Sequence, residues 1–434
     1  MRKATRITEF RLFSGRIFYG WWIVAVCMVV TFAADAVYNP VLSIFVKPLS
    51  DDFGWTRATF SGAITVAVLA GGALSLLIGP LLDKYGAKPV FIFGPAVAGV
   101  CLLLLPQIDA VWQFYLLIGL ARGASVAVVQ LAPGVAVSNW FVKKRGRAMG
   151  VMVVGGRIGA TLLPLFAQYL ISTRSWRDAF FVLGSLILLF SILPSMLFMK
   201  RRPEDVGLTP DGEVPAVKEQ GGLKNPLSHS NIASPESEPA WTLGEALKTP
   251  AFWLLTLASA QAMMAVGGIN LHQVPYLTDK GIAPSLAVVV LSVFAIFAAV
   301  GGLVWGLMSE RVSVRLCLTS SLVGSAASVI LLLLVQDAAM AFVYAGLYGL
   351  SMGGIMALIQ IVYADYYGRR SLGAIRGFTS LFQMVANAIG PLFAGLMFDT
   401  TGSYSIAFVI LAAIYFLGAI WMILARPPRR PCSI

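Results

Sequence analysis

KRRPEDVGLTPDG, residues 200–212, opens the longest polar stretch of the chain, which continues to Thr249 and closes with the short amphipathic sequence WTLGEALK at 241–248. The stretch is rich in charged residues, Pro and Gly, and it holds too little apolar surface to order itself. It therefore predicts a water-exposed linker, residues 200–249, between two blocks of similar length and composition, residues 1–199 and 250–434.

Both blocks have the composition of membrane-embedded helices. The 434-residue chain is 58% hydrophobic and 12% charged, with a mean hydropathy of +0.82. A helix needs about 20 mostly apolar residues to cross a bilayer, and runs of that length recur throughout the sequence. The first run, from Gly20 to about Val46, has no small-residue cleavage site and is expected to stay in place as a continuous spanning helix.

Twelve spans are expected, six in each block, which makes an all-α membrane protein. They cover residues 20–46, 56–82, 89–105, 110–140, 147–171 and 179–199, then 250–274, 284–308, 314–335, 338–366, 372–398 and 404–425. Most Lys and Arg fall in the tails, the linker and the turns on one side. By the positive-inside rule that side, with both termini and the linker, is cytoplasmic in a bacterial-type plasma (inner) membrane. The opposite loops hold Lys47, Arg57, Arg174, Arg177 and Lys280.

The second block repeats the first. Aligning Gly306 with Gly79 also places the sequence PLFA at 391–394 on the same sequence at 164–167. Because each block holds an even number of helices, both copies have the same orientation, which indicates a parallel repeat about an axis normal to the membrane. Two six-helix bundles facing each other across a central cavity are therefore expected.

Several motifs carry a family resemblance. GPLLDKYGAK at 79–88 resembles the loop signature between helices two and three of the major facilitator superfamily, and GLMSERVSVR at 306–315 is similar to a degenerate second copy. FVKPLSDDFGWTRA, NWFVKKRGRAMG, HQVPYLTDKGIA, YYGRRSLGAIRGF and FDTTGSYSIAF resemble the branch that contains oxalate/formate antiporters and monocarboxylate porters. The resemblance covers essentially the entire chain and implies secondary transport by alternating access between the bundles.

One departure from that branch concerns the position of positive charge. The branch typically carries its substrate-binding cations in helix eight, and in helix eleven for dicarboxylate antiporters. Residues 286–308 and 380–397 of this chain hold no Lys, Arg or His. The buried guanidinium groups are therefore expected in the first bundle alone.

The loop signature predicts a conformational latch. Asp83 falls at a helix end, where it can pair with basic residues or with the positive N-terminus of a neighbouring helix and so close the cytoplasmic side in one state. An ordinary charged turn is the alternative, but the signature recurs in the second half. The predicted latch comprises Gly79, Asp83, Lys84, Gly86, Lys88, Glu310 and Arg311.

Ionisable residues deep in the spans are few, namely Asp35, Arg122, Arg157 and His272. A central Arg or Asp costs about 2.5–3.5 kcal/mol to insert, so each such residue needs a partner, a wet cavity or a ligand. Arg122 and Arg157 fall near mid-depth, and their repeat equivalents are Gly349 and Met384. The scaffold itself therefore does not require arginine at these two places.

Two guanidinium groups against one aspartate leave an excess positive charge, which a carboxylate would neutralise through bidentate hydrogen bonds. We predict a small organic anion, a mono- or dicarboxylate, taken up together with protons. Asp35 is either a proton carrier or a permanent counter-ion, and His272 either couples protons or caps a helix. The arginines and the neutral polar residues have structural alternatives, bonding carbonyls or bridging helices. The expected substrate-binding residues are Tyr38, Asn39, Arg122, Arg157, Asn270, His272, Gln360 and Asn387.

Other function classes receive less support. The alternative function is a proton-coupled exporter of apolar or cationic compounds, and a third is a non-transporting receptor in the same fold. No nucleophile, base and orienting group converge, so no catalytic residue and no enzyme activity are expected. No cysteine spacing suggests a metal or disulfide, and no ATP-binding loop or cofactor motif is present. The expected partners of a monomeric chain are the anion, protons and membrane lipids, without nucleic acid.

Overall fold

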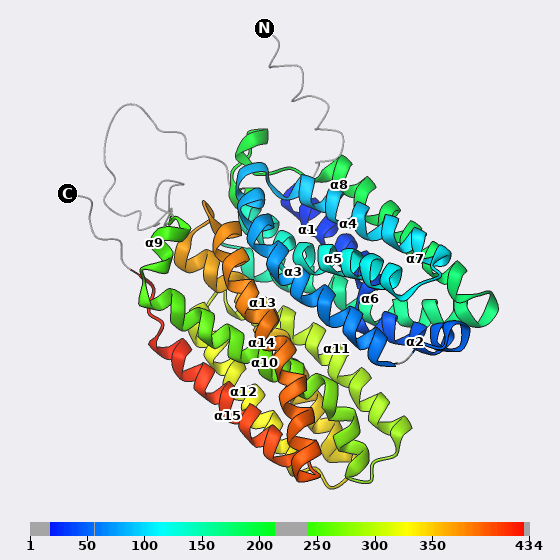
Figure 1. Ribbon diagram of the computed structural model, residues 1–434. Coiled ribbons are helices and arrows are strands. Elements are labelled where there is room, and N and C mark those ends of the chain that lie inside the picture. The colour runs from blue at the N-terminus through cyan, green and yellow to red at the C-terminus, as the bar shows by residue number, and fades with distance from the viewer. Residues whose placement is uncertain (1–17, 56, 213–240, 429–434) are drawn as a thin grey trace, which may run out of the picture.

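The computed structural model describes residues 18–55, 57–212 and 241–428, and these residues form a helical protein (Figure 1). Within them, twelve spans are long and apolar enough to cross a membrane. The prediction of an all-α, twelve-span membrane protein is confirmed. Most of the predicted linker, residues 213–240, lies outside the described residues.

The first half contains six spans. They are α1 (Gly20–Ala34) with α2 (Asn39–Phe53), α3 (Arg57–Tyr85), α4 (Ala87–Leu104), α5 (Val111–Trp140), α6 (Arg145–Thr173), and α7 (Trp176–Ile187) with α8 (Leu193–Phe198). Two of these spans are interrupted. Asp35–Val37 forms one 3-10 turn between α1 and α2, and Leu188–Ile192 forms a π turn between α7 and α8.

The second half contains six uninterrupted spans. They are α10 (Pro250–Asp279), α11 (Pro284–Met308), α12 (Val314–Leu333), α13 (Ala338–Tyr367), α14 (Leu372–Thr401) and α15 (Ser405–Leu424). Side-chain caps fix three of their starts, because Thr249, Ser313 and Asp337 accept the N–H groups of Phe252, Leu316 and Met340, respectively. The short helix α9 (Leu243–Leu247) precedes α10.

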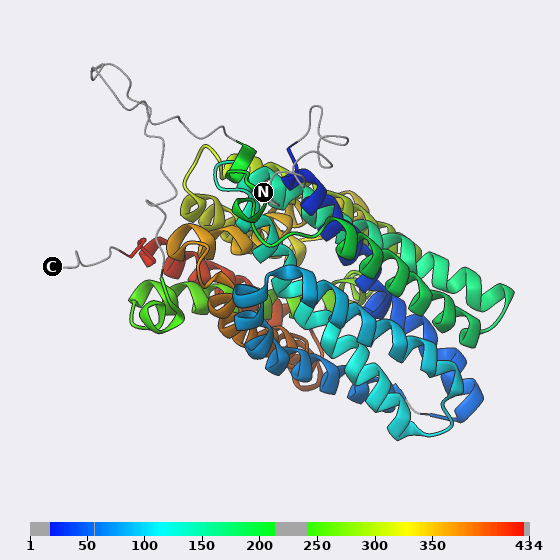
Figure 2. The same cartoon turned by 90° about the horizontal axis from the view of Figure 1, so that it is seen from above.

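The two halves form separate bundles that meet at one end and diverge toward the other (Figures 1 and 2). Contacts between them join α3 to α14, α6 to α11, and α5 to α13 and α14. The first two pairs are equivalent under the repeat, since α3 and α11 are the second spans of their halves and α6 and α14 are the fifth. Glycine permits close crossing: a Cβ on Gly79 or Gly146 would overlap the backbone of Gly373 or Gly306, respectively.

The described parts of the predicted linker lie at the end where the bundles meet, which we call the linker end; the opposite end is the far end. Residues 200–212 and 241–249 form short turns that are hydrogen-bonded to both bundles. Asp211 (φ 61°) accepts the backbone N–H groups of residues 142–144 at 2.8–3.1 Å, and the Trp241 N–H donates to Tyr367 O at 3.2 Å. Residues 241–249 are thus tied to the second bundle, whereas residues 200–212 contact both, since Glu204 also pairs with Arg369, just before α14, at 3.4 Å.

Candidate functional site

The first span is broken near its middle, where the sequence predicted a continuous helix. α1 ends at Ala34, and after the turn Asp35–Val37 the Tyr38 backbone is extended (φ −87°, ψ 163°). α2 restarts with Pro40 in its first turn, where a missing N–H costs least. Broken helices at membrane depth occur where they line a polar site, because the break frees backbone groups for other partners.

Arg122 of α5 occupies this break. The Val41 N–H donates to Tyr38 O, so the Val37 carbonyl has no partner in α2, and Arg122 Nη1 donates to it at 2.9 Å. The guanidinium also lies over the Tyr38 ring, with Cζ 5.3 Å from the ring centroid. Arg122 is 3% exposed, and its Nε has no hydrogen-bond partner within residues 18–55, 57–212 and 241–428. The carbonyl-bonding alternative is therefore seen, but it does not use the whole guanidinium.

Arg157 extends from α6 toward the second bundle. Within the described part of the chain, its guanidinium makes one hydrogen bond, from Nη2 to the thioether Sδ of Met352 on α13, at 3.6 Å. A thioether is a weak and uncharged acceptor. The side chain is partly exposed. Arg157 thus brings a positive charge to the boundary between the bundles without a partner that neutralises it.

Asp35 supplies the negative charge near these arginines, and with Tyr38, Arg122 and Arg157 it forms what we call the central cluster. It is 7% exposed, and its Oδ2 has no hydrogen-bond partner in the part of the chain that the structure describes. Asp35 and Arg157 interact electrostatically, yet among the described residues no carboxylate oxygen lies within 4.0 Å of either arginine's nitrogen atoms. The central cluster therefore holds two cations and one acid that are not locked into an ion pair.

Two predicted binding residues instead bridge helices. Asn387 Nδ2 on α14 donates to Met263 O on α10 at 3.0 Å. His272 on α10 has its Nε2 3.1 Å from Pro391 O, and its ring centroid lies 4.9 Å from that of Tyr404. Both side chains join α10 to its neighbours in the second bundle. For Asn387 this is the helix-bridging alternative, whereas the alternative for His272 was a helix cap.

The other predicted polar residues are less constrained. Asn270 Oδ1 on α10 and Gln360 Oε1 on α13 are buried without hydrogen-bond partners. The side chain of Asn39 lies outside the described residues. Buried amides without partners are costly, so Asn270 and Gln360 stay candidates for contact with a ligand.

Sequence reasoning missed the buried guanidinium of Arg376 in the second bundle. The expectation that only the first bundle contributes buried guanidinium groups is therefore wrong. Arg376 lies one turn into α14 and is 2% exposed. Its Nη2 donates to Gln130 O of α5 at 3.1 Å. The signal was the run of small neighbours Gly373, Ala374 and Gly377, which allows α14 to pack closely on its partners and so buries this turn.

Two carboxylates connect the bundles at the linker end in the same manner. Asp83, at the end of α3, accepts the backbone N–H groups of Gly373 and Ala374 at 2.8 and 2.7 Å. Glu310, just after α11, accepts the backbone N–H and the guanidinium of Arg147, each at 2.9 Å. Each carboxylate thus faces the positive end of a helix in the opposite bundle.

The basic residues of the predicted latch have other partners. Lys88 Nζ donates to a backbone carbonyl of α8 at 2.8 Å, and Lys84 Nζ lies 5.1 Å from the ring centroid of the adjacent tyrosine. Gly86 ends α3 with φ 78°, a conformation that favours glycine, and Arg311 is exposed. Among the described residues, none of these cations forms an ion pair with Asp83.

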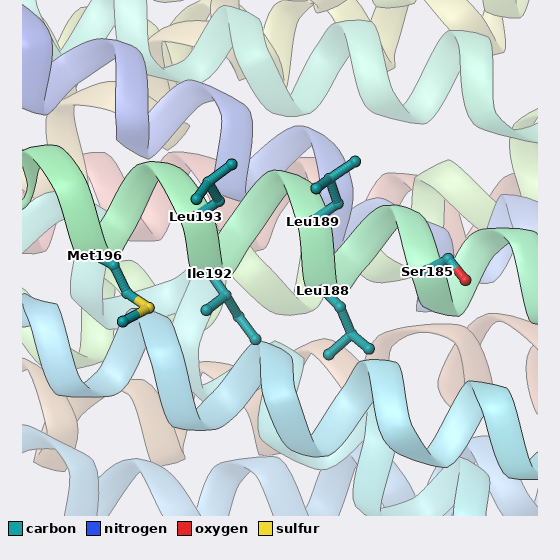
Figure 3. Close-up of a pocket in the computed structure, with 6 residues that line it drawn as sticks. All are labelled: Ser185, Leu188, Leu189, Ile192, Leu193 and Met196. Carbon is teal, nitrogen blue, oxygen red and sulfur yellow. The ribbon is translucent and has the colours of Figure 1, made fainter.

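A groove beside the π turn is chemically different from the central cluster (Figure 3). It is lined by Ser185, Leu188, Leu189, Ile192, Leu193 and Met196. Leu189 and Leu193 point to one side of the helix and are 58% and 51% exposed, as suits a surface against lipid (Figure 3). With one hydroxyl and no charge, the groove offers nothing to hold an ion. Nor do the described residues contain a group of three or more His, Cys, Asp or Glu that could bind a metal.

Comparison with known families and structures agrees with this architecture. A profile of the Major Facilitator Superfamily matches residues 24–288 and 268–433. The proton:xylose symporter XylE, bound to 6-bromo-6-deoxy-D-glucose, superposes with a TM-score of 0.74 at 11% identity, over 94% of this chain and 95% of that one. FucP in the outward conformation gives 0.68 at 14% identity, over 93% and 98%. At these identities the likeness concerns the fold alone.

Sequence relatives agree with the branch resemblance. Monocarboxylate transporter 2 of Homo sapiens is 25% identical over 421 residues, which cover 94% of this chain and 86% of the relative. Monocarboxylate transporter 12-B of Danio rerio is 25% identical over 409 residues, which cover 90% and 84%. The predicted resemblance to the monocarboxylate porter branch is confirmed, at low identity, and these relatives are transporters rather than enzymes.

Proposed function

Because the chain belongs to the Major Facilitator Superfamily and is a multi-pass membrane protein, we propose that it is a secondary active transporter of a small organic anion. The cargo class is a mono- or dicarboxylate, bound between the bundles. The names of the relatives, monocarboxylate transporters 2 and 12-B, support this class. We further propose that the protein is a monomer in a bacterial-type inner membrane and that its linker end faces the cytoplasm.

The charge imbalance of the central cluster carries the proposal. Arg122 and Arg157 face a single acid, Asp35, without an ion pair within 4.0 Å among the described residues. A guanidinium at mid-membrane costs about 2.5–3.5 kcal/mol, and a carboxylate that accepts charge-assisted hydrogen bonds offsets this cost. Arg157 is the main ligand, because its described hydrogen bond goes to a weak thioether acceptor. Arg122 contributes through its unpartnered Nε.

Asp35 is the proposed site of proton coupling. Its Oδ2 is buried and without a partner, beside a guanidinium that an arriving anion would neutralise. Once the anion occupies Arg157, the carboxylate of Asp35 loses its nearest positive neighbour and is favoured to take up a proton. Symport of the anion with protons would drive uptake against a negative interior.

Alternating access is the proposed mechanism. The bundles are held together at the linker end by Asp83 and Glu310 and diverge toward the far end (Figure 1). Releasing these two carboxylates from the helix N-termini would let the linker end open. Asp83, Glu310 and the glycines of the two crossings are therefore the proposed conformational latch.

A thermal-shift screen tests the cargo class. Wild type, Arg157→Gln and Arg174→Gln are compared with acetate, lactate, pyruvate, oxalate and succinate. Arg174 is a matched control because it caps the far end of the same helix and is exposed. A ligand at 100 times its Kd stabilises the folded state by about 2.7 kcal/mol, a shift that is easily measured.

We expect at least one carboxylate to stabilise wild type and Arg174→Gln but not Arg157→Gln, and to be accumulated by proteoliposomes when the bath is acidified. Equal stabilisation of all three proteins would show that the anion binds elsewhere. Stabilisation by apolar cations instead of carboxylates, undiminished in Arg157→Gln, would favour the exporter.

A further inference from the structure

Arg376 is a buried guanidinium that the central cluster does not include. It is 2% exposed, and while Nη2 donates to Gln130 O, its Nε and Nη1 have no hydrogen-bond partners among the described residues. In the described part of the chain, no carboxylate oxygen lies within 4.0 Å of it. Burying an uncompensated cation destabilises a contact, and an apolar side chain of similar length would pack there at lower cost. Packing alone does not account for an arginine here.

The surroundings of Arg376 come from both bundles. A Cβ on Gly134 of α5 would overlap both Arg376 Nη1 and the side-chain oxygen of Gln360 on α13. The guanidinium and this amide therefore lie together against the α5 backbone at Gly134. Gln360 Oε1 is itself buried and unpartnered. Two unsatisfied polar groups of the second bundle thus face one glycine of the first.

Gln130 joins this place to the central cluster. Its backbone oxygen accepts from Arg376, and its side chain lies against the hydroxyl of Tyr38, whose ring is covered by Arg122. Tyr38 and Gln130 therefore connect the guanidinium of Arg122, in the central cluster, to that of Arg376, which lies toward the linker end. Arg376 comes three residues after Gly373, one of the two residues that hold Asp83.

We propose that Arg376 is a second anion contact, masked in this conformation and presented to the linker end when the bundles part there. The inference rests on the proposed function. Releasing the first turn of α14 from Asp83 would withdraw Arg376 from Gln130 O, and the freed guanidinium would offer its full set of N–H donors to a carboxylate. The Gln360 amide supplies a neutral donor beside it. The central cluster holds the anion while the linker end is closed, and Arg376 receives it when that end opens.

The test is the sidedness of the transport KM. Full-length wild type, Arg376→Gln, Arg376→Lys and Arg370→Gln are assayed in intact cells and in inverted vesicles, with the radiolabelled carboxylate that most stabilises wild type. Thiol labelling of an Arg370→Cys variant establishes which end faces the bath. Arg370 is the matched control, since it precedes α14 and is exposed.

Arg376→Gln is expected to raise KM from the linker end about tenfold, the effect of losing one charge-assisted hydrogen bond, while KM from the far end stays within about twofold. The KM of Arg376→Lys from the linker end is expected to lie between those of wild type and Arg376→Gln. The KM of Arg370→Gln is expected to match that of wild type. In the ligand-free protein, Arg376→Met is expected to raise Tm, because it removes an unpaired buried charge.

Equal changes in KM from both ends, or a lower Tm for Arg376→Met, would assign Arg376 a structural role and overturn the inference. A second outcome would overturn the inference but leave the proposed function in place. In it, Arg157→Gln raises KM from both ends, whereas Arg376→Gln does not change KM from one end more than from the other. A wild type that neither binds nor carries any carboxylate of the panel would overturn both.

Discussion

Gly159 sets how closely Asp35 approaches α6. A Cβ at this position would lie 2.7 Å from Asp35 Oδ2 and 2.7 Å from Phe32 O, whereas a Cβ at Gly156 would lie 3.8 Å from Asp35 Oδ2. We expect Gly159→Ala to push the broken first span away from α6 and to destabilise the protein by about 1–3 kcal/mol, the usual cost of overpacking. Thermal unfolding and the initial rate of anion uptake measure both effects.

Gly156→Ala is the matched control, one turn away on the same helix. It is expected to keep Tm and uptake near wild type, because its Cβ would make ordinary van der Waals contact. If Gly159→Ala were as well tolerated as Gly156→Ala, the position of Asp35 against α6 would not matter for transport.

Asp35→Asn separates the two roles considered for this acid. Asparagine resembles the protonated carboxyl group in shape, so a carrier fixed in that form still exchanges one anion for another but no longer couples the anion to protons. We expect counterflow of the labelled carboxylate to persist, whereas accumulation driven by an acidic bath is lost. Loss of both activities would instead identify Asp35 as a permanent counter-ion for the arginines.

Single residues were predictable where their chemistry is rare in a membrane. Asp35, Arg122 and Arg157 stand out because charges in apolar runs are few, and all three fall in one cluster. Arg376 did not stand out, because a charge one turn inside a helix resembles an ordinary basic turn until the packing of α14 is known. The sequence does not distinguish Asn387 from Asn270, because whether an asparagine finds an acceptor on another helix depends on the neighbouring backbone.

At the scale of helices, the carboxylates at the linker end give a direct test of closure. Asp83→Asn removes the charge that faces the N-terminus of α14 and leaves one acceptor oxygen for two N–H groups. A charge at a helix N-terminus contributes about 0.3–1 kcal/mol at exposed sites and up to about 2 kcal/mol when partly buried. We expect expression to be retained and turnover to fall several-fold as the closed linker end is destabilised.

Glu310→Gln, the repeat equivalent, is expected to act in the same direction, because Glu310 holds Arg147 on α6. Lys84→Gln is the control, since it alters the same loop signature without touching α14. Wild-type turnover in Asp83→Asn would leave these contacts as ordinary packing.

The helices themselves were largely predictable, but their interruptions were not. Twelve apolar runs give twelve spans, because length and apolarity decide what crosses a bilayer. The break at Asp35–Tyr38 depends on Pro40 acting together with Arg122, which takes the carbonyl that the break sets free. The π turn at Leu188–Ile192 has no comparable mark in the sequence.

For the whole molecule, the contacts at the linker end predict a conformation that a cross-link can trap. Arg147 and Glu310 meet across the bundles, and Arg145 pairs with Asp365 at 2.6 Å nearby. We expect a short bifunctional thiol reagent to join an Arg147→Cys/Glu310→Cys pair and to reduce transport about tenfold or more, with recovery after reductive cleavage of the reagent.

The two single-cysteine variants treated in the same way control for modification alone. All variants carry Cys432→Ser, and the other cysteines, Cys27, Cys101 and Cys317, are buried and should not react. Full transport with the pair cross-linked would mean that the bundles need not separate at this end.

The internal duplication made the molecule's overall plan predictable. It anticipated two bundles, and the two main contacts between them, α3 with α14 and α6 with α11, are equivalent to each other under the repeat. What it could not supply is the difference between the halves. The central cluster draws its charges from the first bundle, whereas the guanidinium near the linker end belongs to the second. Such differences lie in single side chains that the repeat does not constrain.

The interruption of the first span has a mechanical consequence. The extended backbone of Tyr38 separates two short helices, α1 on the linker side and α2 on the far side, and could serve as a hinge between them. α1 is seated on α6 at Gly155, where even a methyl group would collide with Met28, while α2 contacts α3, α6 and α7. Tilting α2 about this hinge could cover or uncover the anion from the far side while α1 stays seated. Access from that side could thus be controlled by half a helix rather than by an entire bundle.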